Sequence, residues 1–288
     1  MKPEWLTIKP ASTEKYAEIK QTVSSLSLHT VCTEAQCPNI TECWSSGTAT
    51  FMVLGETCTR GCTFCAVSKS AKGSNVDILE PYKLAEAIKK WGLSYVVVTS
   101  VCRDDMEDQG SAHFAKCVQE IKKLTPSTLV EVLIPDFRGD SSCLERVVAS
   151  KPDVIGHNIE TVERLTSDVR DRRAQYRQSL QVLANVKQID STRYTKSAMM
   201  LGIGETDEEV LQAMRDLRAA SVDFLAMGQY LKPKGHHLEL KEYVTPEKFE
   251  YFKQRALEMG FLYVASGPFV RSSYKAGEHF IAAIVNKK

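Results

Sequence analysis

Six nearly continuous apolar runs recur along the chain, separated by segments in which apolar residues repeat every three or four positions. The runs are TATFMVLG (48–55), YVVVTSV (95–101), LVEVLIP (129–135), DVIGHNI (153–159), KSAMMLGI (196–203) and DFLAMGQY (223–230). Strands of a parallel sheet are covered on both faces, so they consist of continuous rather than alternating hydrophobic residues. The runs therefore predict six buried parallel strands.

The segments between the runs have the spacing of helices with one buried face. The stripes are Leu84, Ile88 and Trp91; Phe114, Val118 and Ile121; Leu144, Val147 and Val148; Tyr176, Leu180 and Leu183; and Val210, Met214 and Leu217. A capping box from Thr206 to Glu209 precedes the last stripe, and Thr245-Pro246 predicts the start of a C-terminal helix. This alternation allows an open doubly wound sheet or a full or partial (β/α) barrel. In both, the active site lies at the C-terminal ends of the strands.

The first 48 residues follow a different pattern. A helix is expected near residues 13–24, and the segment VCTEAQCPNITECWSSG after it has the Pro, Asn and Gly content of an irregular loop. We therefore expect an N-terminal extension (1–48), a body of alternating strands and helices (49–240), and a C-terminal part (241–288) with a helix, a strand and the motif RSSY.

Composition and charge narrow the possible functions. The 37 basic and 36 acidic residues give a net charge of +1, so no overall field attracts nucleic acid or an anionic membrane. No stretch approaches the roughly 20 apolar residues of a membrane span, and the first residues lack signal-peptide or transit character. Nine cysteines, an odd number without a secretion signal, favour metal binding or catalysis over a disulfide scaffold. We therefore expect a cytoplasmic protein with no nucleic-acid or membrane partner.

Three cysteines directly after the first predicted strand form the strongest local motif. Cys58, Cys62 and Cys65 have a C-x3-C-x2-C spacing in GETCTRGCTFCAV. Three thiolates can hold a [4Fe–4S] cluster and leave one iron open to a substrate. The alternatives are a zinc knot or a thioredoxin-like pair, but zinc usually takes four ligands from paired motifs. The spacing resembles the radical S-adenosylmethionine (SAM) superfamily, in which SAM binds the open iron and is cleaved to a 5′-deoxyadenosyl radical.

A second triplet, Cys32, Cys37 and Cys43, precedes the first. By itself this spacing is less specific, because it suits a fourth ligand for the first site, a zinc site or a separate cluster. The short distance in sequence between the two triplets favours a second cluster.

Longer motifs resemble the lipoyl synthase family of that superfamily. They are VCTEAQCPNITECWSSGTATFMVLGETCTRGCTFCAV, EVLIPDFRGD (131–140), GHNIETVERL (156–165), TKSAMMLGIGET (195–206), GQYLKP (228–233) and SGPFVRSSY (266–274). The resemblance runs from about residue 28 to residue 280, which is nearly the whole chain.

The resemblance implies an α/β fold, a partial (β/α)6 TIM-type barrel with the cysteine-rich extension at its N-terminus. The first triplet would hold a catalytic [4Fe–4S] cluster. The second triplet would hold an auxiliary [4Fe–4S] cluster with Ser273 as its fourth ligand, and the C-terminal segment would close over it. Serine is a hard oxygen donor on a site otherwise suited to thiolates, so its bond to the cluster should be labile.

The implied reaction replaces one hydrogen at C6 and one at C8 of an octanoyl group by sulfur taken from the auxiliary cluster. The octanoyl group is amide-linked to a lysine of a lipoyl carrier domain or a glycine-cleavage H-type protein. Its C–H bonds carry no activating group, so a radical is required. The implied partners also include an electron donor such as flavodoxin or ferredoxin and an iron–sulfur carrier that rebuilds the cluster.

By the same resemblance, residues at the strand ends would bind SAM: Ser100, Asn158, Glu160 and Glu205. Asn and Glu side chains can hydrogen-bond ribose hydroxyls and an ammonium group. For Asn158 and Glu160 a turn or capping role after the strand is the alternative. Arg271 would steer the substrate, pair with an acid near the auxiliary cluster, or form a surface ion pair.

The chain departs from the family pattern after the second strand. Cys102 stands where we expect aspartate, MEDQGS where a Leu-Pro-Asp-Gly-Gly stretch is usual, and Ala198 where glycine is usual. We interpret Cys102 as a tolerated substitution rather than a redox residue. Cys117 and Cys143 fall in the helices expected at 111–124 and 141–150 and are interpreted as small hydrophobic residues.

Two other functions compete with this interpretation. A two-cluster electron carrier or iron–sulfur scaffold needs no strand and helix body of more than 200 residues. Another radical SAM sulfur-inserting enzyme, such as a tRNA methylthiotransferase, would carry a basic nucleic-acid domain, and here only 14 residues (44–57) separate the triplets.

Overall fold

The computed structural model describes residues 3–6, 13–45, 49–235 and 237–273. The chain forms two compact units. We call Ile8–Arg60 with Ala66–Ile155 the N-terminal unit, and Met1–Thr7, Gly61–Cys65 and Gly156–Lys288 the C-terminal unit. The sequence division at residues 48 and 240 stays a prediction.

The strands of the N-terminal unit are parallel except at one edge. Its elements are α1 (Glu14–Ser25), β1 (His29–Thr30), α2 (Val31–Glu34), α3 (Ile40–Ser45), β2 (Thr50–Val53), β3 (Thr57–Cys58), β4 (Ser68–Lys69), α4 (Glu80–Trp91), β5 (Tyr95–Ser100), α5 (Ser111–Leu124), β6 (Leu129–Leu133), η2 (Phe137–Gly139) and α6 (Ser141–Ala149). Strand β5 pairs in parallel with β2 and β6, whereas β1 is antiparallel to β2. Strands β3 and β4 form a separate parallel pair. All four residues of β2 are buried, which explains its continuous hydrophobic run.

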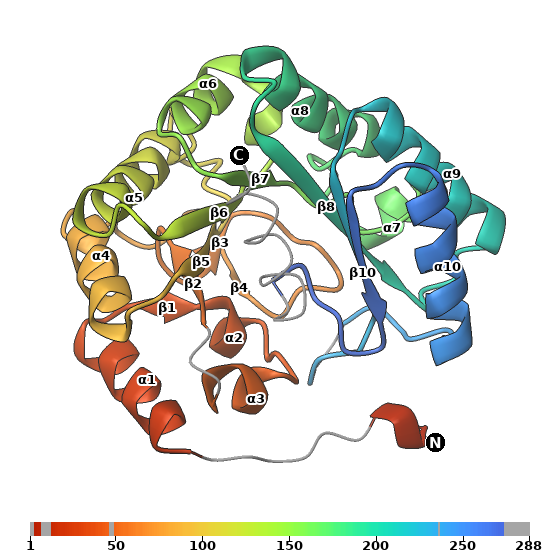
Figure 1. Cartoon of the computed structure of the whole chain (residues 1–288), viewed down its shortest axis with the longest axis horizontal. Helices are drawn as coiled ribbons and strands as arrows, with labels where there is room; N and C mark the ends of the chain where they lie inside the picture. Colours follow the sequence, from red (N-terminus) through yellow and green to blue (C-terminus); the bar gives the residue numbers. More distant parts are fainter. Residues whose placement is uncertain (1–2, 7–12, 46–48, 236, 274–288) are drawn as a thin grey trace. The chain divides into compact units, whose positions relative to one another are not determined.

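Helices α4, α5 and α6 lie side by side along these strands (Figure 1). Their apolar stripes are buried, so the helical spacing in the sequence is confirmed. Gly110 precedes α5 with a φ of 80°, and a Cβ atom there would lie 2.4 Å from Leu54 Cδ1. Glycine therefore meets both a steric and a conformational requirement at this position.

The cysteine segment of the extension is not the irregular loop that its composition predicted. Thr30 caps α2 by accepting a hydrogen bond from the Thr33 N–H, and Gln36 ends the turn with a φ of 50°. Pro38 and Asn39 lie between α2 and α3 rather than inside a helix. The helix-breaking residues thus separate two short helices.

In the C-terminal unit, β9 pairs in parallel with both β8 and β10. The elements are η1 (Glu4–Leu6), η3 (Glu163–Leu165), α7 (Thr166–Val169), α8 (Tyr176–Ile189), β8 (Tyr194–Leu201), α9 (Asp207–Ala219), β9 (Phe224–Gln229), α10 (Pro246–Glu258) and β10 (Tyr263–Gly267). Strand β7 (Val154–Gly156) passes from the first unit into the second. The capping box at Thr206 and the N-cap at Thr245 are both present, as predicted.

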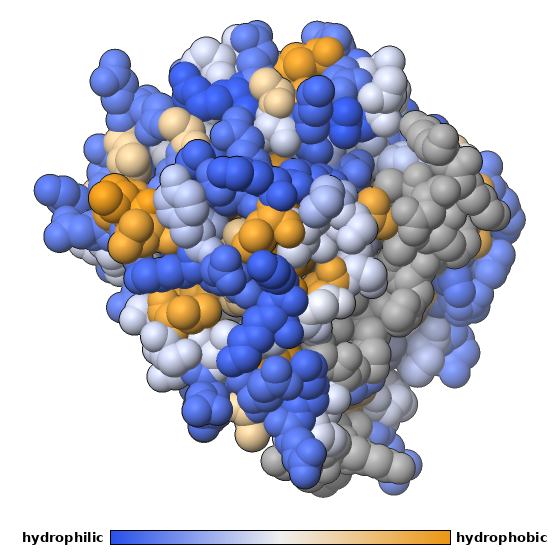
Figure 2. All heavy atoms as spheres, turned by 60° about the vertical axis from the view of Figure 1, so that its left-hand side comes forward, coloured by the Kyte–Doolittle hydropathy of each residue, from blue (hydrophilic) through white to orange (hydrophobic). Residues whose placement is uncertain are grey.

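Large hydrophobic side chains are mostly buried in both units. On the face shown in Figure 2, hydrophobic side chains form small separate patches among hydrophilic ones. Isolated hydrophobic side chains of this kind are normal on a folded surface. Within the described ranges, no helix combines the length and apolar character that crossing a bilayer requires.

Candidate active site

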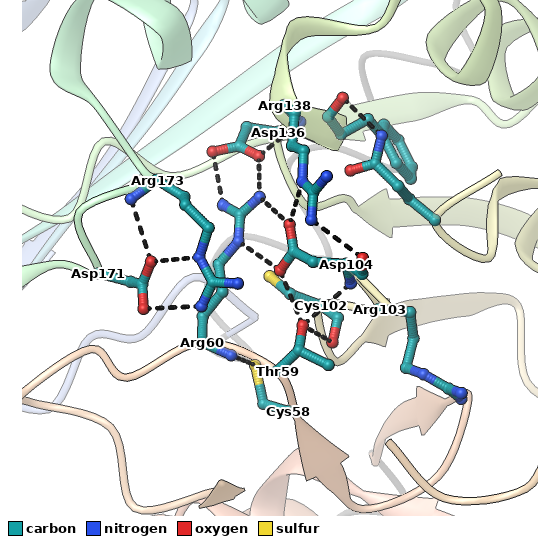
Figure 3. A network of polar contacts seen from close by, with 12 residues as sticks. Cys58, Thr59, Arg60, Cys102, Arg103, Asp104, Asp136, Arg138, Asp171 and Arg173 are labelled. Carbon is teal, nitrogen blue, oxygen red and sulfur yellow. Dashed lines mark hydrogen bonds and ion pairs between the residues drawn. The ribbon is translucent and has the colours of Figure 1, made fainter. Parts of the chain in front are cut away.

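The first cysteine triplet begins on β3, which follows β2 after a short turn. Cys58 ends β3 in the N-terminal unit, and the next residues lie against the loops that follow β5 and β6 (Figure 3). Thr59 donates its N–H to the carbonyl of Cys102 at 3.0 Å, and its hydroxyl hydrogen-bonds the Asp104 carboxylate at 2.7 Å. Segments that are distant in sequence therefore hold the start of the triplet.

Arg60 forms the centre of a buried ion-pair network. Its Nε donates to Asp104 Oδ2 at 3.0 Å, and its Nη1 donates to Asp136 Oδ2 at 2.7 Å. The Arg60, Asp104 and Asp136 side chains are 3%, 2% and 0% exposed. Arg138 adds a hydrogen bond from its Nε to Asp104 Oδ1 at 2.8 Å. Although burial disfavours its charge, the bonds from Arg60 and Thr59 hold the pKa of Asp104 well below its usual range.

The Cys58 thiol has surroundings that favour the thiolate. A hydrogen bond with the Cys102 thiol, the Arg60 N–H at 3.4 Å and the Arg60 charge lower the pKa of Cys58 despite its partial burial. The same hydrogen bond with Cys58, together with burial, raises the pKa of Cys102. Proximity to Cys58 was not expected for a residue that we interpreted as a tolerated substitution.

The rest of the triplet loop belongs to the C-terminal unit and is held by Asp171. The Asp171 carboxylate accepts the Gly61 N–H at 2.8 Å, and the Asp171 N–H donates to Cys62 Sγ at 3.3 Å. The pKa of Asp171 lies well below its usual range, chiefly because Arg173 donates to it at 2.8 Å. Thr63 also donates its N–H to the Val169 carbonyl at 2.9 Å.

That Cys58, Cys62 and Cys65 together hold an iron–sulfur cluster stays a prediction. Clusters are bound by cysteine thiolates, and hydrogen bonds to the sulfurs adjust their potential. In this chain Cys58 and Cys62 each accept a backbone N–H, one within each unit. Cys65 donates its N–H to the Cys62 carbonyl at 3.3 Å, which keeps the last two cysteines in one turn.

The second triplet lies in the N-terminal unit on and between the short helices. Cys32 is on α2, Cys43 is on α3, and the Cys37 N–H donates to the Cys32 carbonyl at 3.0 Å. Burial, with a smaller contribution from the nearby Cys37, raises the pKa of the Cys32 thiol to about 11. Tyr16 packs against Trp44 beside Cys43, with ring centroids 5.2 Å apart.

In the described part of the chain, compact groups of three potential metal-ligating side chains lie outside the two triplets. One compact group, which the sequence did not indicate, is Glu80, His113 and Cys117. Glu80 Oε2 already accepts the Leu54 N–H at 2.9 Å and lies 2.6 Å from His113 Nε2. Glu80 Oε2 and His113 Nε2 are therefore paired within the protein.

Ser273, the predicted fourth ligand of the auxiliary cluster, is half-buried and is the last described residue of the C-terminal unit. The predicted closing segment beyond it (274–288) lies outside the described residues. Arg271 Nη1 donates to the Val270 carbonyl at 2.6 Å. The ligand role of Ser273 stays a prediction.

Two of the strand-end positions predicted to bind SAM have unusual surroundings. Ser100 ends β5, and its buried hydroxyl has no hydrogen-bond partner among the residues that the structure describes. Glu160 has a left-handed φ of 66°, accepts a hydrogen bond from Asn158 Nδ2 at 3.1 Å, and has a pKa raised by burial. Strained backbone and unpaired buried polar atoms are typical of functional sites. Their role in SAM binding stays a prediction.

Glu205 has a local role after β8. Its carboxylate accepts the N–H groups of Gly202 at 2.5 Å and of Ile203 at 3.0 Å. The side chain therefore stabilises the turn that leads into α9, and the prediction that it also contacts SAM stays open. Cys117 and Cys143 are buried in α5 and α6, as expected of small hydrophobic residues, and the Cys143 thiol also donates to the Asp108 carbonyl at 3.3 Å.

Comparison with known proteins places the chain in a family. The family model described as Radical SAM superfamily matches residues 52–217. "Lipoyl synthase, chloroplastic" from Ricinus communis is 55% identical over 292 residues, which cover 100% of this chain and 80% of the relative. "Lipoyl synthase, apicoplast" from Plasmodium yoelii yoelii is 52% identical over 99% of this chain, which spans 57% of that relative's length.

Among solved structures, the FeFe-hydrogenase maturase HydG from Carboxydothermus hydrogenoformans has a TM-score of 0.58 at 12% identity, covering 82% of this chain and 65% of its own. At this identity the likeness concerns the fold alone. With the family match, it confirms the predicted α/β fold of the radical SAM TIM type. The predicted cofactors, SAM and [4Fe–4S] clusters, are confirmed as those of the family. The chain belongs to the lipoyl synthase family of radical SAM enzymes.

Proposed function

We propose that this chain is a lipoyl synthase that inserts sulfur at C6 and C8 of an octanoyl group amide-linked to a lysine of a lipoyl carrier domain. The observation that carries the proposal is the 55% identity to a lipoyl synthase over the whole chain. It is supported by two cysteines of the first triplet that accept backbone N–H groups. A thiolate stabilised in this way is suited to a permanent iron–sulfur site.

The cysteines have separate roles in this proposal. Cys58, Cys62 and Cys65 would hold the catalytic cluster, and the second triplet with Ser273 would hold the auxiliary cluster. When bound, the catalytic cluster supplies the electron that cleaves SAM to methionine and a 5′-deoxyadenosyl radical, and the auxiliary cluster supplies the sulfur. The other groups of the chain bind and orient, because no side-chain base can remove a hydrogen from an unactivated carbon.

The residues at the strand ends would orient SAM. The Ser100 hydroxyl has no partner in the described part of the chain, so it would bind a ligand without the loss of a hydrogen bond seen there. The Asn158 amide and the Glu160 carboxylate already bond to each other, and both can also bond to ribose hydroxyls or an ammonium group. Glu205 would act mainly by shaping the turn after β8.

The partners follow from this chemistry. The substrate is a lipoyl carrier domain or a glycine-cleavage H-type protein, the reductant is flavodoxin or ferredoxin, and an iron–sulfur carrier rebuilds the auxiliary cluster. The triplet cysteines form no disulfide within the described residues, and thiols of this kind persist in a reducing compartment. We propose the cytoplasm, although the two relatives compared above are named as chloroplastic and apicoplast proteins.

The experiment is anaerobic reconstitution followed by iron counting and a SAM-cleavage assay. We expect about eight irons per chain, as two [4Fe–4S] clusters require. We also expect 5′-deoxyadenosine and lipoyl product to form only when an octanoyl-lysyl peptide is added. About four irons, or cleavage that is indifferent to this peptide, would contradict lipoyl synthesis and favour a different radical SAM activity.

A further inference from the structure

Arg60 lies between two proposed cluster ligands in the sequence but is not itself a ligand. Its side chain is 3% exposed, and its guanidinium binds two carboxylates, with Nη2 donating to Asp104 Oδ1 at 3.0 Å and Nη1 to Asp136 Oδ2 at 2.7 Å (Figure 3). Both carboxylates belong to loops at the C-terminal ends of strands, after β5 and after β6. The Arg60 side chain thus links the triplet loop to the edge of the sheet where radical SAM chemistry takes place.

Stability alone explains this network poorly. A buried ion pair often stabilises a fold no better than hydrophobic residues of similar volume, because both charges must leave water. The network therefore needs another explanation, and its geometry supplies one. The backbone of the same arginine donates its N–H to Cys58 Sγ at 3.4 Å.

A second set of bonds fixes the same stretch of backbone. The Thr59 N–H donates to the Cys102 carbonyl at 3.0 Å, and the Asp104 N–H donates to the Thr59 hydroxyl at 3.0 Å. Residues 58–60 are therefore held through both main-chain and side-chain groups. The direction of the Arg60 N–H depends on this attachment.

We propose that Arg60 is a positioning residue that keeps its own N–H directed at the Cys58 sulfur and thereby sets the reduction potential of the catalytic cluster. This inference rests on the proposed function, in which Cys58 is a cluster ligand. A hydrogen bond to a ligating sulfur stabilises the more electron-rich, reduced cluster, so it raises the potential. Loosening the guanidinium should therefore make the potential more negative and the cluster easier to lose.

The test compares reconstituted full-length variants by redox titration monitored by electron paramagnetic resonance and by the rate of iron release to a chelator. Arg60→Lys keeps the charge but loses the planar fork. We expect a more negative midpoint potential and iron release faster by about ten- to a hundredfold, the range usual for residues that support metal ligands. Asp136→Asn preserves the side-chain volume and should shift both quantities in the same direction by less.

Arg103→Lys is the matched control. Arg103 is also a buried arginine, 4% exposed, but its guanidinium binds the Asp105 carboxylate and the Leu54 carbonyl. We expect this variant to lose thermal stability while keeping the wild-type potential. A potential that shifts equally in Arg103→Lys and Arg60→Lys would overturn the proposal, since the effect would then be general destabilisation.

Other outcomes separate this inference from the proposed function. If Arg60→Lys does not fold, Asp136→Asn decides, and an unchanged potential in that variant overturns the positioning role. If the wild-type chain binds no catalytic cluster, the proposed function itself fails. If the wild-type chain binds the cluster and both variants keep its potential and iron-release rate, only the inference about Arg60 fails.

Discussion

Cys58 of the first triplet and Cys32 of the second have opposite electrostatic surroundings. Cys58 meets a thiol, a backbone N–H and a buried guanidinium, and these lower its pKa, whereas burial raises the pKa of Cys32 to about 11. At Cys58 the protein itself favours the thiolate that a cluster requires. At Cys32 burial favours the neutral thiol, so binding iron would have to displace a proton. A permanent cofactor and a sulfur source that is consumed and rebuilt would place these different demands on their sites.

The two triplets also differ in how their backbone is held. Residues 58–60 are fixed by buried charges from loops 44 and 76 residues away. Cys32 and Cys43 lie on short helices held by local bonds, such as the Thr30 cap and the bond from the Cys43 N–H to the Asn39 carbonyl at 2.9 Å. Helices of this size are only marginally stable by themselves. The second triplet should therefore rearrange more easily than the first.

The largest expected effect comes from Cys62→Ala. Cys62 accepts the Asp171 N–H and is a proposed ligand of the catalytic cluster. We expect the loss of both SAM cleavage and sulfur insertion, measured as 5′-deoxyadenosine and lipoyl product by mass spectrometry. Cys117→Ala, which removes a buried thiol of α5 far from either triplet in sequence, is the control and should retain cleavage. Substantial SAM cleavage by Cys62→Ala would show that the first triplet does not hold the cluster that cleaves SAM.

A large loss of stability is expected from Arg60→Ala. Removing this guanidinium leaves Asp136 and Asp104, which are 0% and 2% exposed, without their main cation. Breaking a buried pair in this way costs about 3–5 kcal/mol in the free energy of unfolding. Urea denaturation followed by circular dichroism would measure it. A loss below about 1 kcal/mol is typical of a surface ion pair. It would contradict the claim that buried charges hold the first triplet more firmly than local bonds hold the second.

The pH dependence of thiol reactivity tests the electrostatic contrast directly. The pKa of Cys58 is lower in the folded chain than in the unfolded chain, where a cysteine has a pKa of about 8.5. Its thiolate therefore stabilises the fold above about pH 8.5, and this stabilisation is lost as the pH falls through the pKa of the folded state. The pKa of Cys32 is raised to about 11 in the folded chain. Its neutral thiol therefore stabilises the fold below the unfolded pKa of about 8.5, and this stabilisation is lost as the pH rises toward 11. In the cluster-free chain at pH 7.5, iodoacetamide should alkylate Cys58 at least about ten times faster than Cys32. Equal rates by peptide mapping would show that the surroundings of the two thiols do not differ in this way.

The smallest expected effect comes from Thr30→Ala. The Thr30 hydroxyl caps α2, which carries Cys32, and losing an N-cap costs about 1 kcal/mol. We expect a small decrease in the free energy of unfolding and faster iron loss from the auxiliary cluster alone. Thr206→Ala, which removes the cap of α9 in the C-terminal unit, is the matched control and should leave auxiliary iron unchanged. If both variants lose auxiliary iron equally, local helix stability does not control that site.

Much of the fold could be predicted because burial on both faces produces continuous hydrophobic runs. All six runs contain strands, and the helix expected at 111–124 is observed over the same residues as α5. Strand β1 was missed because two residues carry no pattern. Helices α2 and α3 were missed because Pro38 and Asn39 favoured a loop, although both residues fall between the helices.

The site could be predicted less completely. Cysteine spacing indicated the triplets, and the resemblance supplied Ser273, but neither indicated the Arg60 network. Its members lie far apart in sequence and have no periodicity, so only the folded chain brings them together. Asp104 lies in the loop that departs from the family pattern. We therefore assigned no function to the residues of that loop by resemblance. The left-handed backbone of Glu160 was likewise invisible in the sequence.

The central claim is that the first triplet serves SAM cleavage and the second supplies sulfur. It is tested most directly by Cys37→Ala, assayed with an octanoyl-lysyl peptide in a single reaction. The account predicts that this variant still cleaves SAM to 5′-deoxyadenosine but forms no lipoyl product. A Cys37→Ala variant that still forms lipoyl product would contradict the assignment of the second triplet as the sulfur source.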